Sequence, residues 1–113
     1  METLSDIESF PIEIIFRNLD RSAAIEDEAR RRLEKLNHFY NRIQSCRLTI
    51  ELEGKHHTQG RNFDVRIDMS VPGEELVVSH AHRNEDVYVA LKDATASAKR
   101  RLEEFAEKHR HAL

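Results

Sequence analysis

Apolar residues occupy every second position in four stretches of the chain, which is the period of a half-buried β-strand. In the first stretch, residues 11–17 (PIEIIFR), apolar side chains recur from Ile12 through Ile14 to Phe16. The other three stretches are residues 46–54 (CRLTIELEG), 62–71 (NFDVRIDMSV) and 76–81 (LVVSHA). The pattern predicts four strands, one before and three after a long segment with a different period.

Two segments place their apolar residues three and four positions apart, which is typical of amphipathic helices. The first follows Asp20 and Ser22, either of which can cap a helix by accepting hydrogen bonds from free backbone N–H groups, and it ends near residues 37–41. The second follows Asn84 or Asp86 and continues to about His109. Their apolar stripes are Ile25, Ala29, Leu33, Leu36 and Tyr40 in the first helix, and Val87, Leu91, Ala94, Ala98, Leu102 and Phe105 in the second.

The order of elements is therefore β-α-β-β-β-α. Short polar segments separate the last three strands, so we expect an antiparallel meander with one face in water. Packing both apolar stripes against one side of the sheet gives an α+β fold, a four-stranded sheet with two helices on one face. Residues 1–10 show no period and are predicted to be a flexible lead-in. Residues 11–113 are predicted to form a single domain, and the 113 residues suffice for one modest core.

The charges along the chain are unevenly distributed. The net charge is −3, from 18 Lys and Arg against 21 Asp and Glu, which argues weakly against a protein dedicated to nucleic acid. Residues 30–43 nevertheless carry five basic side chains against one acid, and residues 99–113 carry five against three. Two helices lying side by side present their outer faces together, so these segments could form one surface for RNA phosphates. The candidate RNA-binding residues are Arg31, Arg32, Lys35, Arg42, Lys92, Lys99, Arg100 and Arg101.

An ordinary interpretation of the same residues is a solvated helix surface, with the cations paired to acids one turn away such as Glu34, Glu103 and Glu104. Charge patterning alone favours this interpretation in a typical protein. The expected side-by-side helices favour the RNA surface. Aromatic side chains near the first helix are limited to Phe39 and Tyr40, so base stacking is expected to contribute little.

Motifs for catalysis are absent from the sequence. It contains no Gly-rich phosphate loop, no GxSxG, no HExxH and no CxxC, and we therefore predict neither an enzyme nor a cofactor. Among the seven histidines, His56, His57, His80 and His82 are expected at one edge of the meander, where a zinc or other transition-metal site is conceivable. Their spacing is weak and nothing completes a tetrahedron, so solvated histidines are the preferred interpretation and no metal site is predicted.

The location of the protein follows from two features. Cys46 is the single cysteine and cannot form an internal disulfide, which indicates a reducing cytoplasm. No apolar run approaches the roughly 20 residues that cross a bilayer, and the N-terminus has no signal-peptide pattern. We therefore predict a cytoplasmic protein with no membrane partner.

Two motifs make the chain resemble a known family. They are KLxxFxxRI at residues 35–43 and DxYxAL at residues 86–91, with a meander that turns at VPGEELVV between them. From about Ile12 to Phe105 the chain is similar to the ribosome-hibernation promoting factors and ribosome-associated inhibitors, also called sigma-54 modulation proteins. The resemblance implies a fold akin to double-stranded-RNA-binding domains. It also implies binding to the small ribosomal subunit, in the mRNA/tRNA channel between head and body, and suppression of translation in stationary or stressed cells.

Individual residues carry the resemblance further. Arg32 and Lys35 match basic positions on the family's first helix, and Arg100 matches one on its second. Asp86 and Tyr88 match the family's acid and tyrosine at the start of that helix. The partner that the resemblance implies is the ribosomal RNA of the small subunit, with no small-molecule substrate.

Other positions depart from the family. Ser97 and Glu104 stand where basic residues are frequent, Glu26 replaces another basic residue, and Lys92 stands where an acid is common. These departures motivate a second hypothesis, a protein-interaction module that keeps the fold but binds ribosomes weakly or not at all. Its partner would be another protein, or a second copy of the chain paired through an exposed edge of the sheet as a homodimer.

Overall fold

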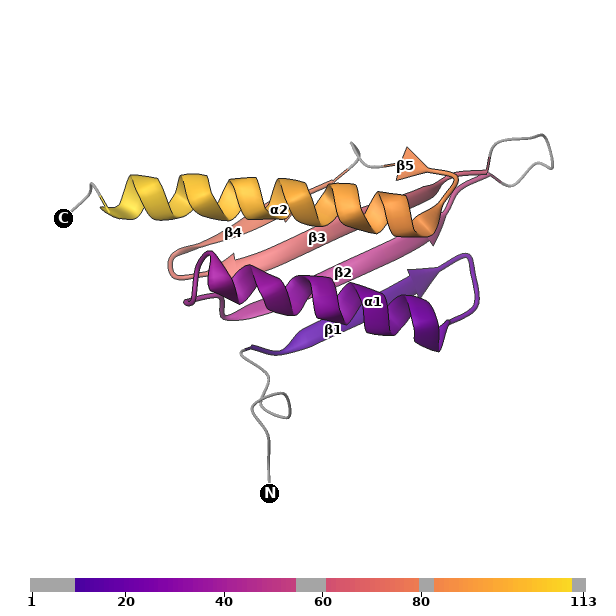
Figure 1. The fold of residues 1–113 in the computed structure, drawn as a ribbon, viewed down its shortest axis with the longest axis horizontal. Coiled ribbons are helices and arrows are strands. Elements are labelled where there is room, and N and C mark those ends of the chain that lie inside the picture. The colour runs from indigo at the N-terminus through magenta and orange to yellow at the C-terminus, as the bar shows by residue number, and fades with distance from the viewer. Residues whose placement is uncertain (1–9, 55–60, 80–82, 111–113) are drawn as a thin grey trace, which may run out of the picture.

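The computed structural model describes residues 10–54, 61–79 and 83–110. Figure 1 shows a twisted sheet with two helices lying side by side across one of its faces. The elements in chain order are β1 (Ile12–Arg17), α1 (Ala23–Glu34), the 3₁₀ turn η2 (Lys35–His38), β2 (Ser45–Leu52), β3 (Phe63–Val71), β4 (Glu74–Val78), β5 (Arg83–Asn84) and α2 (Val87–Arg110). The predicted α+β fold with both helices on one face is confirmed.

The main path of the sheet runs β1-β2-β3-β4. β1 and β2 are parallel, with Ile14 opposite Leu48, and α1 makes the crossover that a parallel pair requires. β2, β3 and β4 form the predicted antiparallel meander, with Leu48 opposite Ile67 and Ile67 opposite Val78. The period of two places every second residue of each strand under the helices.

Two details of the strands differ from the prediction. The two-residue β5 pairs with β3, with Asn84 opposite Phe63, and makes the sheet five-stranded. Two polar residues are too few to show a period, so the sequence pattern does not predict this strand. β4 begins at Glu74 rather than at residue 76 and ends at Val78. Gly73 takes a left-handed backbone conformation (φ 87°), which allows a tight turn and brings the polar Glu74 directly into the ladder.

One continuous core fills the space between the helices and the sheet. Leu48, Ile50, Val65, Ile67 and Met69 from the two central strands are 0% exposed. Leu33 of α1 and Leu91, Ala94, Ala98 and Leu102 of α2 cover them and are equally buried. Phe10, which the sequence pattern assigns to the lead-in, is 3% exposed and belongs to this core; residues 1–9 lie outside the described residues.

Both helices begin at one of the residues predicted to cap them. The Ser22 hydroxyl accepts a hydrogen bond from the backbone N–H of Ile25 (3.2 Å), and the Asp86 carboxylate accepts one from that of Tyr88 (2.9 Å). The α-helical part of α1 ends at Glu34, and η2 carries the chain on to His38. The length and hydropathy that a bilayer-spanning helix needs are not found together in any helix of the described ranges.

Candidate nucleic-acid interface

The basic residues of α1 divide between its two flanks. Arg30 lies on the flank beside β1, because its guanidinium donates to the backbone carbonyl of Ile12 (3.4 Å). Successive residues of a helix are rotated by about 100°, so Arg32 lies on the opposite flank, the one turned toward α2. Arg31 and Lys35, four residues apart, both lie on the exposed outer surface near that flank.

The basic residues of α2 also divide, although the sequence presents Lys99, Arg100 and Arg101 as one run. Lys99 lies on the flank facing α1, because its ammonium is 4.5 Å from the centre of the Phe39 ring. Lys92, two helical turns earlier, lies on the same flank. Arg100 and Arg101 lie on the other flank, where they line a groove against β4. The rotation of the helix therefore separates Lys99 from its two neighbours.

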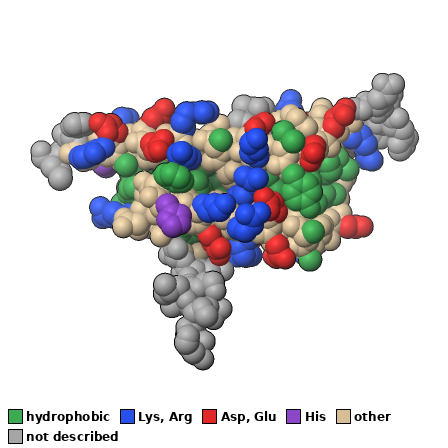
Figure 2. Space-filling model, viewed as in Figure 1, with side chains coloured by type: hydrophobic (Ala, Val, Ile, Leu, Met, Phe, Trp, Pro, Cys, Tyr) green, Lys and Arg blue, Asp and Glu red, His purple; other side chains and the backbone are tan. Residues whose placement is uncertain are grey.

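Five of the eight predicted residues thus lie on the facing flanks of the two helices or on the outer surface beside those flanks. Figure 2 shows Lys and Arg side chains forming a band that crosses from α2 to α1 near the middle of this face, with acidic side chains to either side. We call this surface the interhelical band; its members are Arg31, Arg32, Lys35, Lys92 and Lys99. The helices therefore present one positive surface and not two separate ones.

Glu28 neutralises part of the interhelical band. Its carboxylate binds the guanidinium of Arg31 and, at 2.7 Å, the Nε of Arg32. Partial burial works against ionisation of Glu28, but the hydrogen bonds and charges of the two arginines outweigh it and lower its pKa. Glu28 is therefore ionised at neutral pH and offsets one of the two arginine charges.

The three lysines carry the available charge of the band. Lys35, Lys92 and Lys99 form no ion pair with any residue in the described parts of the chain. Lys35 and Lys92 are exposed to solvent, and Lys99 rests against an aromatic face that leaves its ammonium free to meet an anion. A phosphate contact at these positions breaks no existing salt bridge.

Two exposed aromatic side chains accompany the band. Phe39 is 42% exposed beneath Lys99, and Tyr88 is 44% exposed on α2, four residues before Lys92 and on the same flank. Tyr40, predicted with Phe39 as a stacking candidate, instead packs edge-on against Phe105 with 5.5 Å between ring centres. Tyr88, and not Tyr40, is therefore the exposed tyrosine that could stack on a base. The sequence pattern does not predict this, because a residue at the start of α2 lies near α1 only after the helices pack.

The other three predicted residues lie outside the band. Arg42 is exposed in the turn between η2 and β2. Arg100 donates to the hydroxyl of Ser97 (3.1 Å), and Arg101 lies 3.8 Å from the carboxylate of Glu104. A single flat RNA surface on the band would not reach all eight side chains.

A model of one protein family matches residues 12–110, which is most of the chain. That family is described as "Sigma 54 modulation protein / S30EA ribosomal protein". The chain belongs to this family. The resemblance inferred from the two motifs is thereby confirmed, and the interhelical band is a surface on a protein with the S30EA family fold.

Two solved structures share the fold of this S30EA-family chain. A ribosomal subunit interface protein from Coxiella burnetii superposes with a TM-score of 0.74 at 12% identity, covering 86% of this chain and 98% of that one. The N-terminal domain of Protein Y from Thermus thermophilus superposes with a TM-score of 0.69 at 22% identity, covering 82% and 94%. No match is found among curated protein sequences. At these identities the two structures establish the fold only.

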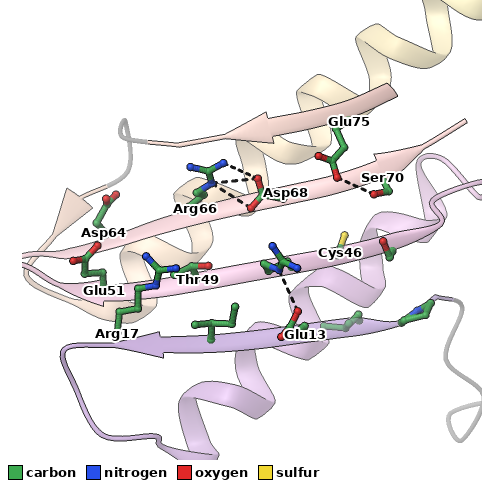
Figure 3. Close-up of a pocket in the computed structure, with 15 residues that line it drawn as sticks. Glu13, Arg17, Cys46, Thr49, Glu51, Asp64, Arg66, Asp68, Ser70 and Glu75 are labelled. Atoms are coloured by element: carbon green, nitrogen blue, oxygen red, sulfur yellow. Dashed lines mark hydrogen bonds and ion pairs between the residues drawn. The ribbon is translucent and has the colours of Figure 1, made fainter. Parts of the chain in front are cut away.

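The open face of the sheet in this S30EA-family protein has the opposite electrostatic character. A hollow of about 760 Å³ lies over the strands. Figure 3 shows the side chains that line it, on the side of the sheet away from the helices. Five carboxylates line it against three guanidiniums, and Arg47 and Arg66 are already bound to Glu13 (3.1 Å) and Asp68 (3.0 Å). The carboxylates in excess repel phosphate, so the helix face is the only one of the two suited to RNA.

No metal or reactive thiol is associated with the described surface. His56, His57, His80 and His82 lie outside the described residues. Within the described ranges, no three His, Cys, Asp or Glu side chains are placed to hold a metal ion. Cys46 lies within β2, is 4% exposed and faces the core.

The thiol of Cys46 is expected to be inert in the native protein. Burial, together with the negative charge of Asp68, raises its pKa from 9.0 to about 12. A disulfide reagent at pH 8 should react with the native thiol roughly a thousandfold more slowly than with the denatured one, because about three pKa units separate their thiolate fractions. Equal rates in the two states would show that the thiol is accessible and ionised.

The raised pKa of Cys46 also makes the stability of the protein depend on pH. The native thiol stays neutral while the unfolded thiol ionises, so this contribution is intact below pH 9.0. It is lost as the pH rises from 9.0 toward 12. Urea titrations at increasing pH, with the Cys46→Ala variant as the reference, measure it as a difference in the slope of unfolding free energy against pH.

Proposed function

We propose that this protein is a ribosome-associated stress factor that binds the small ribosomal subunit in its mRNA/tRNA channel and inhibits translation. Membership of the S30EA family supports association with ribosomes. The interhelical band carries the RNA-binding part of the proposal, because it gathers on one face, from two distant segments, lysines that form no ion pair with any described residue. The cytoplasm, where translation takes place, is its proposed location.

The band is proposed to grip the RNA backbone. Lys35, Lys92 and Lys99 meet phosphate oxygens without giving up an ion pair to any described residue. Arg31 and Arg32 share Glu28 and contribute less. Phe39 and Tyr88 offer ring faces for unpaired bases. These contacts are largely independent of RNA sequence, so the site recognises the shape and charge of a channel.

The outlying cations extend the proposed contact. Arg42, Arg100 and Arg101 flank the band on two sides and would meet rRNA that curves around the helices. A channel enclosed by rRNA presents phosphates from several directions, so cations pointing in different directions all find partners there. Translation stops in this mechanism because a body lodged in the channel excludes mRNA and tRNA, and no bond is made or broken.

Cosedimentation with purified small subunits tests the proposal. We expect the protein to pellet with the subunits and its affinity to fall as the salt concentration rises. The log–log slope should be roughly −3 to −5, because each phosphate contact contributes about one unit. Excess mRNA and tRNA bound beforehand should prevent binding, and added protein should inhibit translation in a reconstituted system. Protein that stays in the supernatant at low salt contradicts the proposal and favours the protein-interaction module instead.

A further inference from the structure

The two edges of the sheet differ in how their backbone groups are occupied. At the β1 edge, Arg21 donates to the carbonyl of Ile14 (3.3 Å) and Arg30 to the carbonyl of Ile12 (3.4 Å). The carbonyl of Pro11 bonds inward to β2, so the carbonyls of Ile12 and Ile14 point to the outside of the sheet. Guanidiniums therefore occupy the acceptors that an added strand would need, and the β1 edge is blocked.

The β4 edge has no such cover in the described part of the chain. β4 pairs with β3 along one side only, and its outer side forms no ladder with any described residue. Val77 is 40% exposed on this strand, and the five-residue element contains no proline and no lysine to discourage pairing. An extended strand of matching chemistry can therefore continue the sheet at β4.

The chemistry of that strand is set by a groove between β4 and α2. The groove has a volume of about 260 Å³ and is lined by Val77, Val78, Ser79, Ser97, Arg100, Arg101 and Glu104. Its two guanidiniums face the second half of β4, and the single carboxylate, Glu104, is 3.8 Å from one of them. The groove therefore favours an added strand that brings a carboxylate on the helix-covered side.

β4 itself carries a carboxylate on its helix-covered side. Its side chains alternate, with Leu76 and Val78 buried under the helices and Glu75 and Val77 on the open side, so Glu74 belongs to the helix-covered side. Glu74 is exposed and forms no ion pair with any described residue. The first half of β4 thus carries the acid that the groove beside its second half would accept.

We propose that two copies of this protein pair through antiparallel β4 strands and form a continuous sheet across a twofold axis. With Leu76 of one copy opposite Leu76 of the other, Glu74 of each copy falls opposite Val78 of its partner. It then lies on the helix-covered side, beside the partner's groove with Arg100 and Arg101. The contact is made twice, as a twofold interface requires.

The pairing leaves the interhelical band free, although it uses Arg100 and Arg101, which are also proposed to extend the RNA contact. It uses the flank of α2 that faces β4, whereas the interhelical band occupies the flank that faces α1. Both bands stay uncovered in the dimer, on the same side of the continuous sheet. Alanine at Lys35, Lys92 and Lys99 should weaken ribosome binding with the dimer intact, and Glu74→Arg should weaken the dimer with ribosome binding intact, so these two variants distinguish the two proposals.

Sedimentation equilibrium over a dilution series tests the pairing, with variants that exchange the charges of Glu74 and Arg101. We expect the wild-type protein to pass from the 13.2 kDa monomer to twice that mass as its concentration rises. Glu74→Arg and Arg101→Glu should each weaken dimerisation by tenfold or more, on the order of one lost charge contact made twice. The double variant should recover it, because the exchanged charges face each other again across the axis. The control Glu51→Arg makes the same change of charge on the open face of β2 and should dimerise as the wild type does.

Hydrogen exchange supplies a second readout that does not depend on charge. The outward amides of β4 should exchange more slowly at high protein concentration, and those of Glu74→Arg should not change. Wild-type protein that stays monomeric at about 1 mM, a concentration that half-forms even a millimolar dimer, overturns the proposal. A dimer that survives both single substitutions, or a double variant that fails to recover while remaining folded by circular dichroism, overturns it as well.

Discussion

Replacing Lys35, Lys92 and Lys99 together with alanine should reduce affinity for the small ribosomal subunit by roughly 10²- to 10³-fold near 0.1 M salt. The three ammonium groups are the members of the interhelical band without an ion pair in the described structure, so removing them deletes phosphate contacts and no internal salt bridge. The log–log salt slope should become shallower by about 2 to 3. Filter binding or cosedimentation across a salt series measures both quantities.

A matched control is available on the other side of the sheet. Alanine at Arg17, Arg47 and Arg66 removes the same number of positive charges from the open face, where carboxylates outnumber them. This variant has the same net charge as the lysine variant and should bind with nearly the wild-type affinity and salt slope. If the two triple variants lose affinity equally, net charge governs the binding and the band has no special role.

Replacing Leu33 with alanine should have the largest effect on stability among single substitutions in α1. Leu33 is 0% exposed in the last α-helical turn before η2, and it belongs to the core that joins α1 to the sheet and α2. The lost contacts and the remaining cavity should cost about 2–5 kcal/mol, a large part of the 5–15 kcal/mol typical of a domain. Urea unfolding followed by circular dichroism gives the change as a lower midpoint at constant slope.

Leu33→Met is the control for that measurement, because it keeps the volume and hydrophobic character of the side chain and should cost less than about 1.5 kcal/mol. Lys35 and the arginines of the band sit on the same helix. RNA binding by Leu33→Ala should therefore weaken under conditions in which the variant is still mostly folded, as α1 loosens from α2. A cost below about 1 kcal/mol would show that α1 does not depend on this packing.

Local periodicity predicted most of the fold, and the failures have identifiable causes. Alternation in residues 62–71 and the three-and-four spacing in α2 are strong signals, because a half-buried element must repeat with the geometry of its backbone. β5 has two polar residues, so only its register with β3 defines it. Phe10 carries no period of its own, so the pattern places it in the lead-in, yet it is buried by residues distant in the sequence.

The candidate interface was predicted less completely than the fold. The sequence identified eight cations by type and segment, and five of them lie on the facing flanks of the two helices or on the outer surface beside those flanks. It did not divide Lys99 from Arg100 and Arg101. The rotation of about 100° between neighbours separates them on the helix, but only the packing shows which flank of α2 faces α1 and which faces β4. It also could not rank the cations, because pairing of Arg31 and Arg32 with Glu28 depends on which side chains meet in space.

The sequence by itself determined the order of the elements, the side of each element that is buried and the family, and it limited each helix cap to two residues. These properties depend on interactions within a few residues, or on a pattern repeated along one element, so they can be deduced without knowing how the elements pack. The tertiary structure alone decided which cations share a surface, that the open sheet face is lined by an excess of carboxylates, and that one sheet edge is blocked while the other is open. Those properties arise only when α1 and α2 pack side by side on the sheet and bring residues about sixty positions apart into contact, such as Phe39 and Lys99.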